Sequence, residues 1–155
     1  MKLSDQYIAG FFDGEGCIHI GSQLHSWCNN PTYVLSVIVG QVRTDVISVL
    51  YEEYGGTFRK CTKKNDKSDR YSWVWKISGK TARDFLLRIR PFLIQKGEEA
   101  DVAFRFCEHK DAYDLRSLVQ LGQQGTVERV LREREQMKQQ LSALKKPKLD
   151  PARSI

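Results

Sequence analysis

Two acidic residues stand where side chains of their kind could hold a metal ion. Asp13 and Glu15 lie one residue apart in Asp13-Gly14-Glu15-Gly16, directly after an apolar run that begins at Tyr7. A helix over that run would end beside both carboxylates, where the helix dipole disfavours each negative charge by about 0.3–1 kcal/mol. A hard cation bound there would make the position of the two carboxylates favourable, because Mg²⁺ prefers carboxylate, carbonyl and water oxygens. An ordinary solvated turn is the alternative interpretation of an isolated Asp-Gly-Glu-Gly.

The neighbouring glycines favour a functional site over a surface turn. Gly10 and Gly14 are four residues apart, so they share one face of a helix. A face without side chains lets a second helix backbone come very close, and Ala9 keeps its flank small. The run also leads straight into the alternating segment Cys17–His25, which indicates a strand.

The elements that would position these residues can be predicted from caps, periodicity and turn residues. Ser4 is a suitable N-cap for a helix over Tyr7–Asp13, which Gly14 and Gly16 would end. We predict four strands over Cys17–His25, Tyr33–Val39, Thr57–Lys63 and Tyr71–Ser78. Further helices are predicted over Val46–Tyr54, Thr81–Ile89 and Lys96–His109, with a helical pattern that continues to about Leu144 after a break near Gly122 and Gly125. We expect Pro147–Ile155 to be a frayed tail.

The order α-β-β-α-β-β-α predicts an α+β domain with a four-stranded antiparallel sheet. Helices would cover one face of the sheet and leave the other face open. We expect residues 1–110 to form the core and residues 111–155 to form a C-terminal helical extension and tail of the same domain.

Composition excludes several classes of protein. The chain has 155 residues, of which 41% are hydrophobic and 28% charged, as expected for one compact globular domain. No apolar stretch of about 18 residues exists, so we expect no membrane span, and the first residues lack a secretory h-region. The four cysteines lack CxxC spacing, which favours reduced thiols in an intracellular compartment: the cytoplasm or nucleoid, or an organelle.

Positive charge is concentrated in two segments. The net charge is +6, and residues 59–70 and 128–148 each carry a net charge of +4. Two basic clusters on a nearly neutral body are typical of a nucleic-acid-binding protein.

The segment Ile8–Gly16 resembles the LAGLIDADG motif of homing endonucleases. Ala9, Gly10, Asp13 and Gly16 match the letters of the motif, and Glu15 stands in place of its second Asp. Two later segments are also similar to the family: Gln41 to Gly56, with Asp45 and Gly55 inside it, and Pro91-Phe92-Leu93-Ile94-Gln95-Lys96. The resemblance extends to about Tyr113 and implies the fold of that family.

The resemblance also implies an activity and an assembly. A chain with one motif implies a homodimer, with an interface at Tyr7, Gly10, Phe11 and Gly14. The implied function is site-specific hydrolysis of double-stranded DNA at a long pseudo-palindromic target, by an intron-encoded or free-standing enzyme. Glu15, Gln41 and Lys96 would be catalytic, and Glu15, the Gly14 carbonyl and Asp13 would be the metal ligands. Mg²⁺ is the implied cofactor; Mn²⁺ would replace it, and Ca²⁺ would support binding without cleavage.

Two other functions remain open at this point. Some relatives are maturases, which bind RNA and assist intron splicing, and a relative that binds DNA but has lost cleavage is the other alternative. Both would keep the fold, so the residues named above do not separate them from the nuclease. No membrane partner is expected.

In this family the open face of the sheet lies in the major groove of DNA, which carries a unique pattern of base-edge donors and acceptors. Alternation along the strands, together with the basic loops, gives the predicted DNA-binding residues: His19, Gln23, His25, Ser36, Ile38, Arg43, Thr57, Arg59, Lys60, Cys61, Lys63, Lys64, Lys67, Arg70 and Ser72. The opposite alternation predicts the core: Ile18, Ile20, Leu35, Val37, Val39, Phe58, Trp73, Trp75 and Ile77.

Overall fold

The first helix passes directly into the first strand. The structure, a computed structural model, describes residues 2–62 and 71–146. Helix α1 spans Asp5–Glu15; the Ser4 hydroxyl caps it by accepting a hydrogen bond from the Tyr7 N–H at 3.3 Å. The predicted end at Asp13 was two residues short, because Gly14 and Glu15 still have helical backbone. The Gly16 N–H closes the last turn on the Phe12 carbonyl, and the strand begins at this same Gly16.

The four predicted strands form one antiparallel sheet in the order β1-β2-β4-β3. They are β1 (Gly16–Gln23), β2 (Thr32–Gln41), β3 (Thr57–Thr62) and β4 (Tyr71–Ser78). The prediction of β1 was too long, because the chain leaves the ladder after Gln23. His25 therefore lies in the β1–β2 connection, where its ring stacks on Trp27 at 4.8 Å between centroids.

The helices follow the predicted order. They are α2 (Asp45–Tyr54), α3 (Gly79–Ile89), α4 (Gly97–Ala112), α5 (Leu115–Gln120) and α6 (Gln124–Leu144), with a 3₁₀ turn, η1, at Arg90–Phe92. Gly122 makes the break before α6 with a φ of 69°, a value that favours glycine. Gly125, the other predicted breaker, lies inside the first turn of α6.

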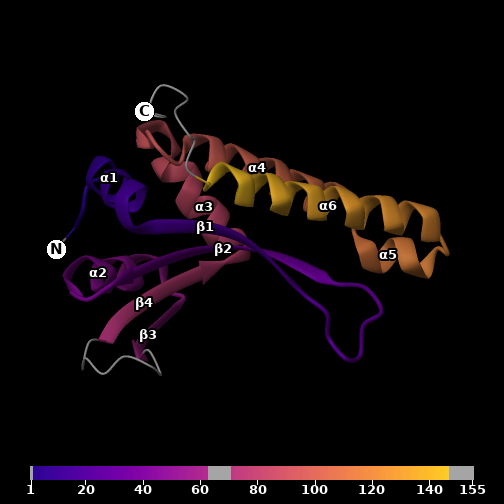
Figure 1. Cartoon of the computed structure of the whole chain (residues 1–155), viewed down its shortest axis with the longest axis horizontal. Helices are drawn as coiled ribbons and strands as arrows, with labels where there is room; N and C mark the ends of the chain where they lie inside the picture. The colour runs from indigo at the N-terminus through magenta and orange to yellow at the C-terminus, as the bar shows by residue number, and fades with distance from the viewer. Residues whose placement is uncertain (1, 63–70, 147–155) are drawn as a thin grey trace, which may run out of the picture.

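The core lies between the sheet and the helices, and Figure 1 shows α3, α4 and α6 on one side of the sheet. The predicted core residues are buried, except that Phe58 and Trp73 are only partly buried at the β3–β4 end. Trp75 is fully buried, and its indole N–H donates to the Gly55 carbonyl at 2.9 Å. This bond satisfies the one polar atom of a side chain that otherwise contacts aromatic rings.

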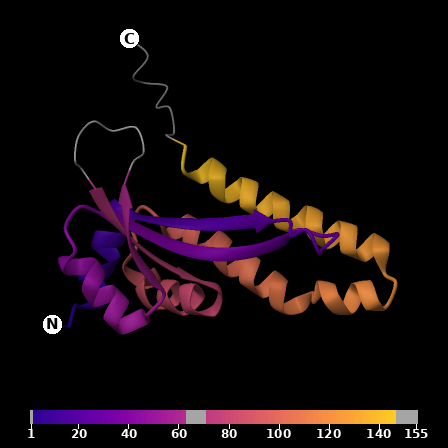
Figure 2. The same cartoon turned by 90° about the horizontal axis from the view of Figure 1, so that it is seen from below.

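Helix α6 runs along the β1–β2 hairpin (Figure 2). The Lys138 ammonium donates to the Ser22 hydroxyl at 2.8 Å, and the Tyr33 hydroxyl donates to Glu135 at 2.8 Å. Val127, Val130 and Leu141 supply its buried apolar side chains. The C-terminal half of α6 is thus attached to the strands. None of the helices in the described residues is long and apolar enough to cross a bilayer.

Candidate active site and nucleic-acid interface

Asp13 is buried and joins the end of α1 to the start of α4. Its side chain is 8% exposed, and its two carboxylate oxygens accept three backbone N–H groups: Ile94 at 2.7 Å, Gln95 at 3.2 Å and Lys96 at 3.0 Å. These donors precede α4, so the carboxylate fixes the turn that carries Lys96. The predicted role of Asp13 as a metal ligand stays a prediction, and the contacts show it anchoring this turn.

Lys96 lies beside the motif. Its ammonium donates a hydrogen bond to the Asp13 carbonyl, one of the carbonyls at the C-terminal end of α1. A cation there complements the negative end of the helix dipole. Together with the three bonds to the Asp13 side chain, this contact brings a lysine from residue 96 to within one turn of Glu15.

Glu15 is exposed at the last position of α1, in contrast to Asp13. Gln41 lies at the same end of the sheet, because Gly16 is paired with Val39 and β2 continues two residues further. The predicted catalytic residues Glu15, Gln41 and Lys96 thus come from three separate elements and gather at one end of the molecule.

A pocket of about 320 Å³ adjoins this end and brings in two residues that the sequence did not single out. It is lined by Lys96 and Glu99 from the start of α4 and by Lys145 from the C-terminal end of α6. The Lys145 ammonium donates to the Ile18 carbonyl and to the Cys17 sulfur, the latter at 3.3 Å. Burial raises the pKa of the Glu99 carboxyl, while Lys145 and Lys96 act in the opposite direction. Only the spacing of Glu99 from Lys96, three residues apart in the predicted helix Lys96–His109, could have indicated Glu99.

One face of α1 is open. A Cβ atom built on Gly10 or on Gly14 would meet no heavy atom within 4 Å outside the local helix backbone, in the part of the chain that the structure describes. Tyr7 on the same helix is 51% exposed, whereas Phe11 is partly buried against the core. Ile94, in the turn held by Asp13, is 89% exposed. A surface of this kind, with small and apolar residues, is suited to close contact with another helix.

The open face of the sheet carries the residues that alternation predicts. Register places His19 opposite Ser36, Cys17 opposite Ile38, Arg59 opposite Val74 and Cys61 opposite Ser72, all on the same face. His19, Gln23, Thr57 and Arg59 are exposed, and Ile38, Cys61 and Ser72 are half-buried. Lys76, which the sequence interpretation missed, is also exposed on this face opposite Thr57. Its position in the alternation between Val74 and Ser78 could have found it.

His19 lies in a basic environment on this face. Partial burial lowers the pKa of its imidazole, and the charges of Lys145, Lys76 and Lys138 lower it further. The lowered pKa favours the neutral ring, which offers one hydrogen-bond donor and one acceptor.

The remaining predicted DNA-binding residues are buried on the open face, lie away from it, or lie outside the described residues. Ser36 is on the open face but only 4% exposed, and its hydroxyl is paired with that of Ser78 at 2.9 Å, so a direct base contact would have to break this pair. Lys60 alternates to the opposite face of β3, the face of Phe58. Arg43 follows β2 and is bonded to Asp45 at 3.0 Å. Lys63, Lys64, Lys67 and Arg70 lie outside the described residues.

Comparison with known proteins connects this geometry to solved structures. No protein-family model and no curated protein sequence matches the chain. Its structure is similar to that of the homing endonuclease I-CvuI, solved with the I-CreI DNA target, with a TM-score of 0.67 and 21% identity over 94% of this chain and 84% of the other. It is similar to the archaeal intron-encoded homing endonuclease I-Vdi141I, solved with DNA, with a TM-score of 0.66, 14% identity, and coverage of 94% and 88%. It also resembles the LAGLIDADG homing endonuclease I-GzeII, with a TM-score of 0.56 and 12% identity, over 72% of this chain and 37% of that one.

The chain has the LAGLIDADG homing endonuclease fold. The predicted fold class is thereby confirmed, including the four-stranded antiparallel sheet and the C-terminal helices. In this LAGLIDADG fold, the motif Ile8–Gly16 is the C-terminal part of α1 and its junction with β1.

Proposed function

We propose that this protein is a homodimeric, metal-dependent endonuclease that cleaves double-stranded DNA at a specific, pseudo-palindromic site. The observation that carries the proposal is the exposed Glu15 carboxylate at the end of α1, next to the open Gly10–Gly14 face and at the same end as Lys96 and Gln41. A second copy docked on this face would bring its own Glu15 beside the first. Two-fold symmetry of the protein would then be matched by symmetry of the DNA site.

The donors at this end fit a hard divalent cation only when two chains contribute. Glu15 supplies a carboxylate and Gly14 a carbonyl, which are oxygen ligands suited to Mg²⁺. Among the described residues of one chain, no group of three or more His, Cys, Asp or Glu side chains could hold a metal ion. The Glu15 carboxylates of the two chains, with the Gly14 carbonyls, would hold such a cation, which would supply activation of water and stabilisation of the leaving oxygen. Under this proposal Mn²⁺ replaces Mg²⁺, and Ca²⁺ supports binding alone.

The side chains around Glu15 would hold and complement the DNA backbone. Asp13 fixes the turn before α4, so the Lys96 ammonium is positioned before any substrate binds. This fixed positive charge would stabilise negative charge that develops on a cleaved phosphate. The Gln41 amide can donate and accept hydrogen bonds with water at the same end. His19, Gln23 and Arg59 on the open face would read bases, and Lys76 would contact phosphates or bases there.

Cleavage by Glu15→Gln protein tests the catalytic part of the proposal. A library of partly palindromic duplexes is incubated with Mg²⁺, and the new ends are sequenced; EDTA should abolish the cuts. We expect wild type to produce ends that share one pseudo-palindrome, and Glu15→Gln to bind that site but not cut it. Glu108→Gln, at an exposed position on α4, is the matched control and should cut normally. Cuts by Glu15→Gln at the wild-type rate would refute the assignment, and no cuts by dimeric wild type would favour a DNA-binding or RNA-maturase function.

Self-association tests the assembly. Gly10→Leu places a large side chain on the open face of α1, and Gly125→Leu places the same side chain at an equally open position on α6. By sedimentation velocity we expect wild type and Gly125→Leu to be dimers, and Gly10→Leu to be a monomer without cleavage activity. An unchanged dimer in Gly10→Leu would place the interface elsewhere.

A further inference from the structure

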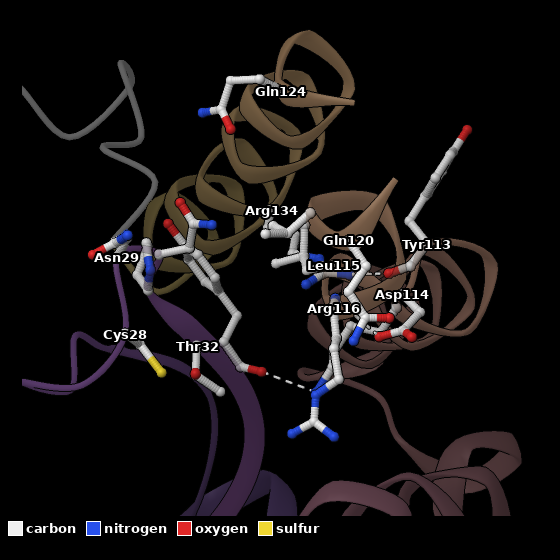
Figure 3. Close-up of a pocket in the computed structure, with 15 residues that line it drawn as sticks. Cys28, Asn29, Thr32, Tyr113, Asp114, Leu115, Arg116, Gln120, Gln124 and Arg134 are labelled. Atoms are coloured by element: carbon white, nitrogen blue, oxygen red, sulfur yellow. Dashed lines mark hydrogen bonds between the residues drawn. The ribbon is translucent and has the colours of Figure 1, made fainter. Parts of the chain in front are cut away.

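A second pocket lies away from the candidate active site. It has a volume of about 760 Å³ and lies between the end of the β1–β2 connection, the end of α4, α5 and the start of α6. Figure 3 shows the residues that line it, with Arg134 between the strand side and α5. Glu15 directly precedes Gly16, the first residue of β1, whereas the pocket adjoins the other end of the β1–β2 hairpin. The length of β1 between these two ends is about 23 Å, at roughly 3.3 Å per residue.

Two cations line this pocket, Arg134 buried and Lys110 half-buried, and the hydrogen bonds of both go to neutral carbonyls. Arg134 is 4% exposed; one of its terminal nitrogens donates to the Tyr113 carbonyl at 2.7 Å. Its Nε has no hydrogen-bond partner among the described residues. The Lys110 ammonium, half-buried, donates to the Tyr33 carbonyl at 3.0 Å. In the part of the chain that the structure describes, neither side chain forms an ion pair.

The nearby carboxylates are already engaged. Asp114, which also lines the pocket, caps α5 by accepting from the N–H groups of Arg116 and Ser117 and from the Ser117 hydroxyl. It attracts Arg134 through space without contacting it. Burial lowers the pKa of both Arg134 and Lys110, because the charged forms lose hydration and the surrounding groups do not compensate for that loss.

A buried charge without a counter-ion is costly, and an unmade hydrogen bond at Arg134 adds to that cost. Folded proteins usually pair such charges, so a cavity that holds two of them and is open enough for a ligand points to an anion. Guanidinium and ammonium groups together favour an anion that carries more than one negative charge and several acceptor oxygens, as a phosphate does.

We propose that this pocket binds a phosphate group, held by Arg134 and Lys110, with Arg116 at its rim. The volume exceeds that of inorganic phosphate and is in the range of sites for small organic ligands, so the phosphate can be carried on a nucleotide. The side-chain amides of Asn29, Gln120 and Gln124, which line the same pocket, offer donors and acceptors for the rest of such a molecule. The proposal does not depend on DNA cleavage or on Glu15.

The test measures thermal stability and calorimetric binding of the full chain with three probes. These are inorganic phosphate, adenosine monophosphate and a single-stranded oligonucleotide, each compared with sodium chloride at equal ionic strength. Arg134→Met removes the buried charge and keeps an apolar side chain. Arg132→Met, at an exposed position two residues away on α6, removes the same charge without touching the pocket.

We expect phosphate or the nucleotide to raise the melting temperature of wild type and Arg132→Met by about 5–10 °C at one hundred times its Kd, and not that of Arg134→Met. If only the oligonucleotide raises the melting temperature, and Arg134→Met loses this response, the phosphate comes from the backbone of a single-stranded nucleic acid. Equal responses of both variants, or no response to any probe, would overturn the proposal. Lys110→Gln, expected to weaken phosphate binding at least tenfold, keeps the test decisive if Arg134→Met does not fold.

Discussion

The buried Asp13 carboxylate provides a sharp test of how the candidate site is held. If it anchors the turn before α4, then Asp13→Asn should destabilise the fold even when no metal is present. One oxygen accepts from Ile94 and Gln95 and the other from Lys96. Asparagine can keep the first pair of bonds with its carbonyl, but its NH₂ group would then face the Lys96 N–H, donor against donor.

The size of the effect follows from these contacts. A hydrogen bond to a charged group contributes about 1.5–3 kcal/mol, and a buried donor left without a partner costs about 1–3 kcal/mol. The substitution removes one such bond and weakens the other two, so we expect a loss of about 2–4 kcal/mol in the free energy of unfolding. For a chain of this length the melting temperature should fall by about 5–15 °C.

Urea unfolding in the presence of EDTA measures this loss directly. The midpoint should decrease with an unchanged slope, because the amount of surface exposed on unfolding stays the same. Asp84→Asn, at an exposed position on α3, is the control and should change stability by no more than about 0.5 kcal/mol. If Asp13 served only as a metal ligand, Asp13→Asn would be at least as stable as wild type without metal, because removing a carboxylate near Glu15 relieves repulsion between the two charges. Asp13→Asn as stable as wild type without metal would refute the anchoring role.

Two further predictions concern the junction of α1 with β1 and the contact of α6 with the hairpin. Gly16→Ala places a Cβ about 2.1 Å from the buried Phe12 ring, so it should destabilise the fold by about 1–3 kcal/mol. Gly125→Ala, in the first turn of α6 with open space around it, should instead stabilise the fold by about 0.5–1 kcal/mol. Urea unfolding of both variants tests this contrast, and equal effects would contradict it. Burial and the bond to Glu135 raise the pKa of Tyr33 to about 12. Because the unfolded chain releases this proton near pH 10 and the folded chain retains it, a contribution of about 2 kcal/mol present below pH 10 should be lost as pH rises to about 12. Tyr33→Phe should show a correspondingly flatter stability profile over that range, and an identical slope in both proteins would show that Tyr33 does not titrate as described.

The local sequence was sufficient to predict most of the secondary structure and the open face of α1 beside the candidate site. Alternation in β2 and β4 gave the buried and open faces of the sheet, because a strand places successive side chains on opposite sides. The glycines at positions 10 and 14 gave the open face of α1, since helical spacing depends only on the sequence. Errors occurred at the ends of elements: α1 continues through Gly14 because Gly16, not Gly14, closes its last turn.

What the sequence alone determined is therefore the order of elements, the faces of the sheet and helices, and the carboxylates of the motif. Tertiary structure decided what each group touches. Asp13 and Glu15 look equivalent in sequence, yet one is buried on the N–H groups of residues 94–96 and the other is exposed. Lys145 reaches Ile18, and Arg134 and Lys110 line one pocket near Tyr33, across more than 70 residues of chain. Such contacts depend on how separate elements dock, and no local pattern of residues contains that information.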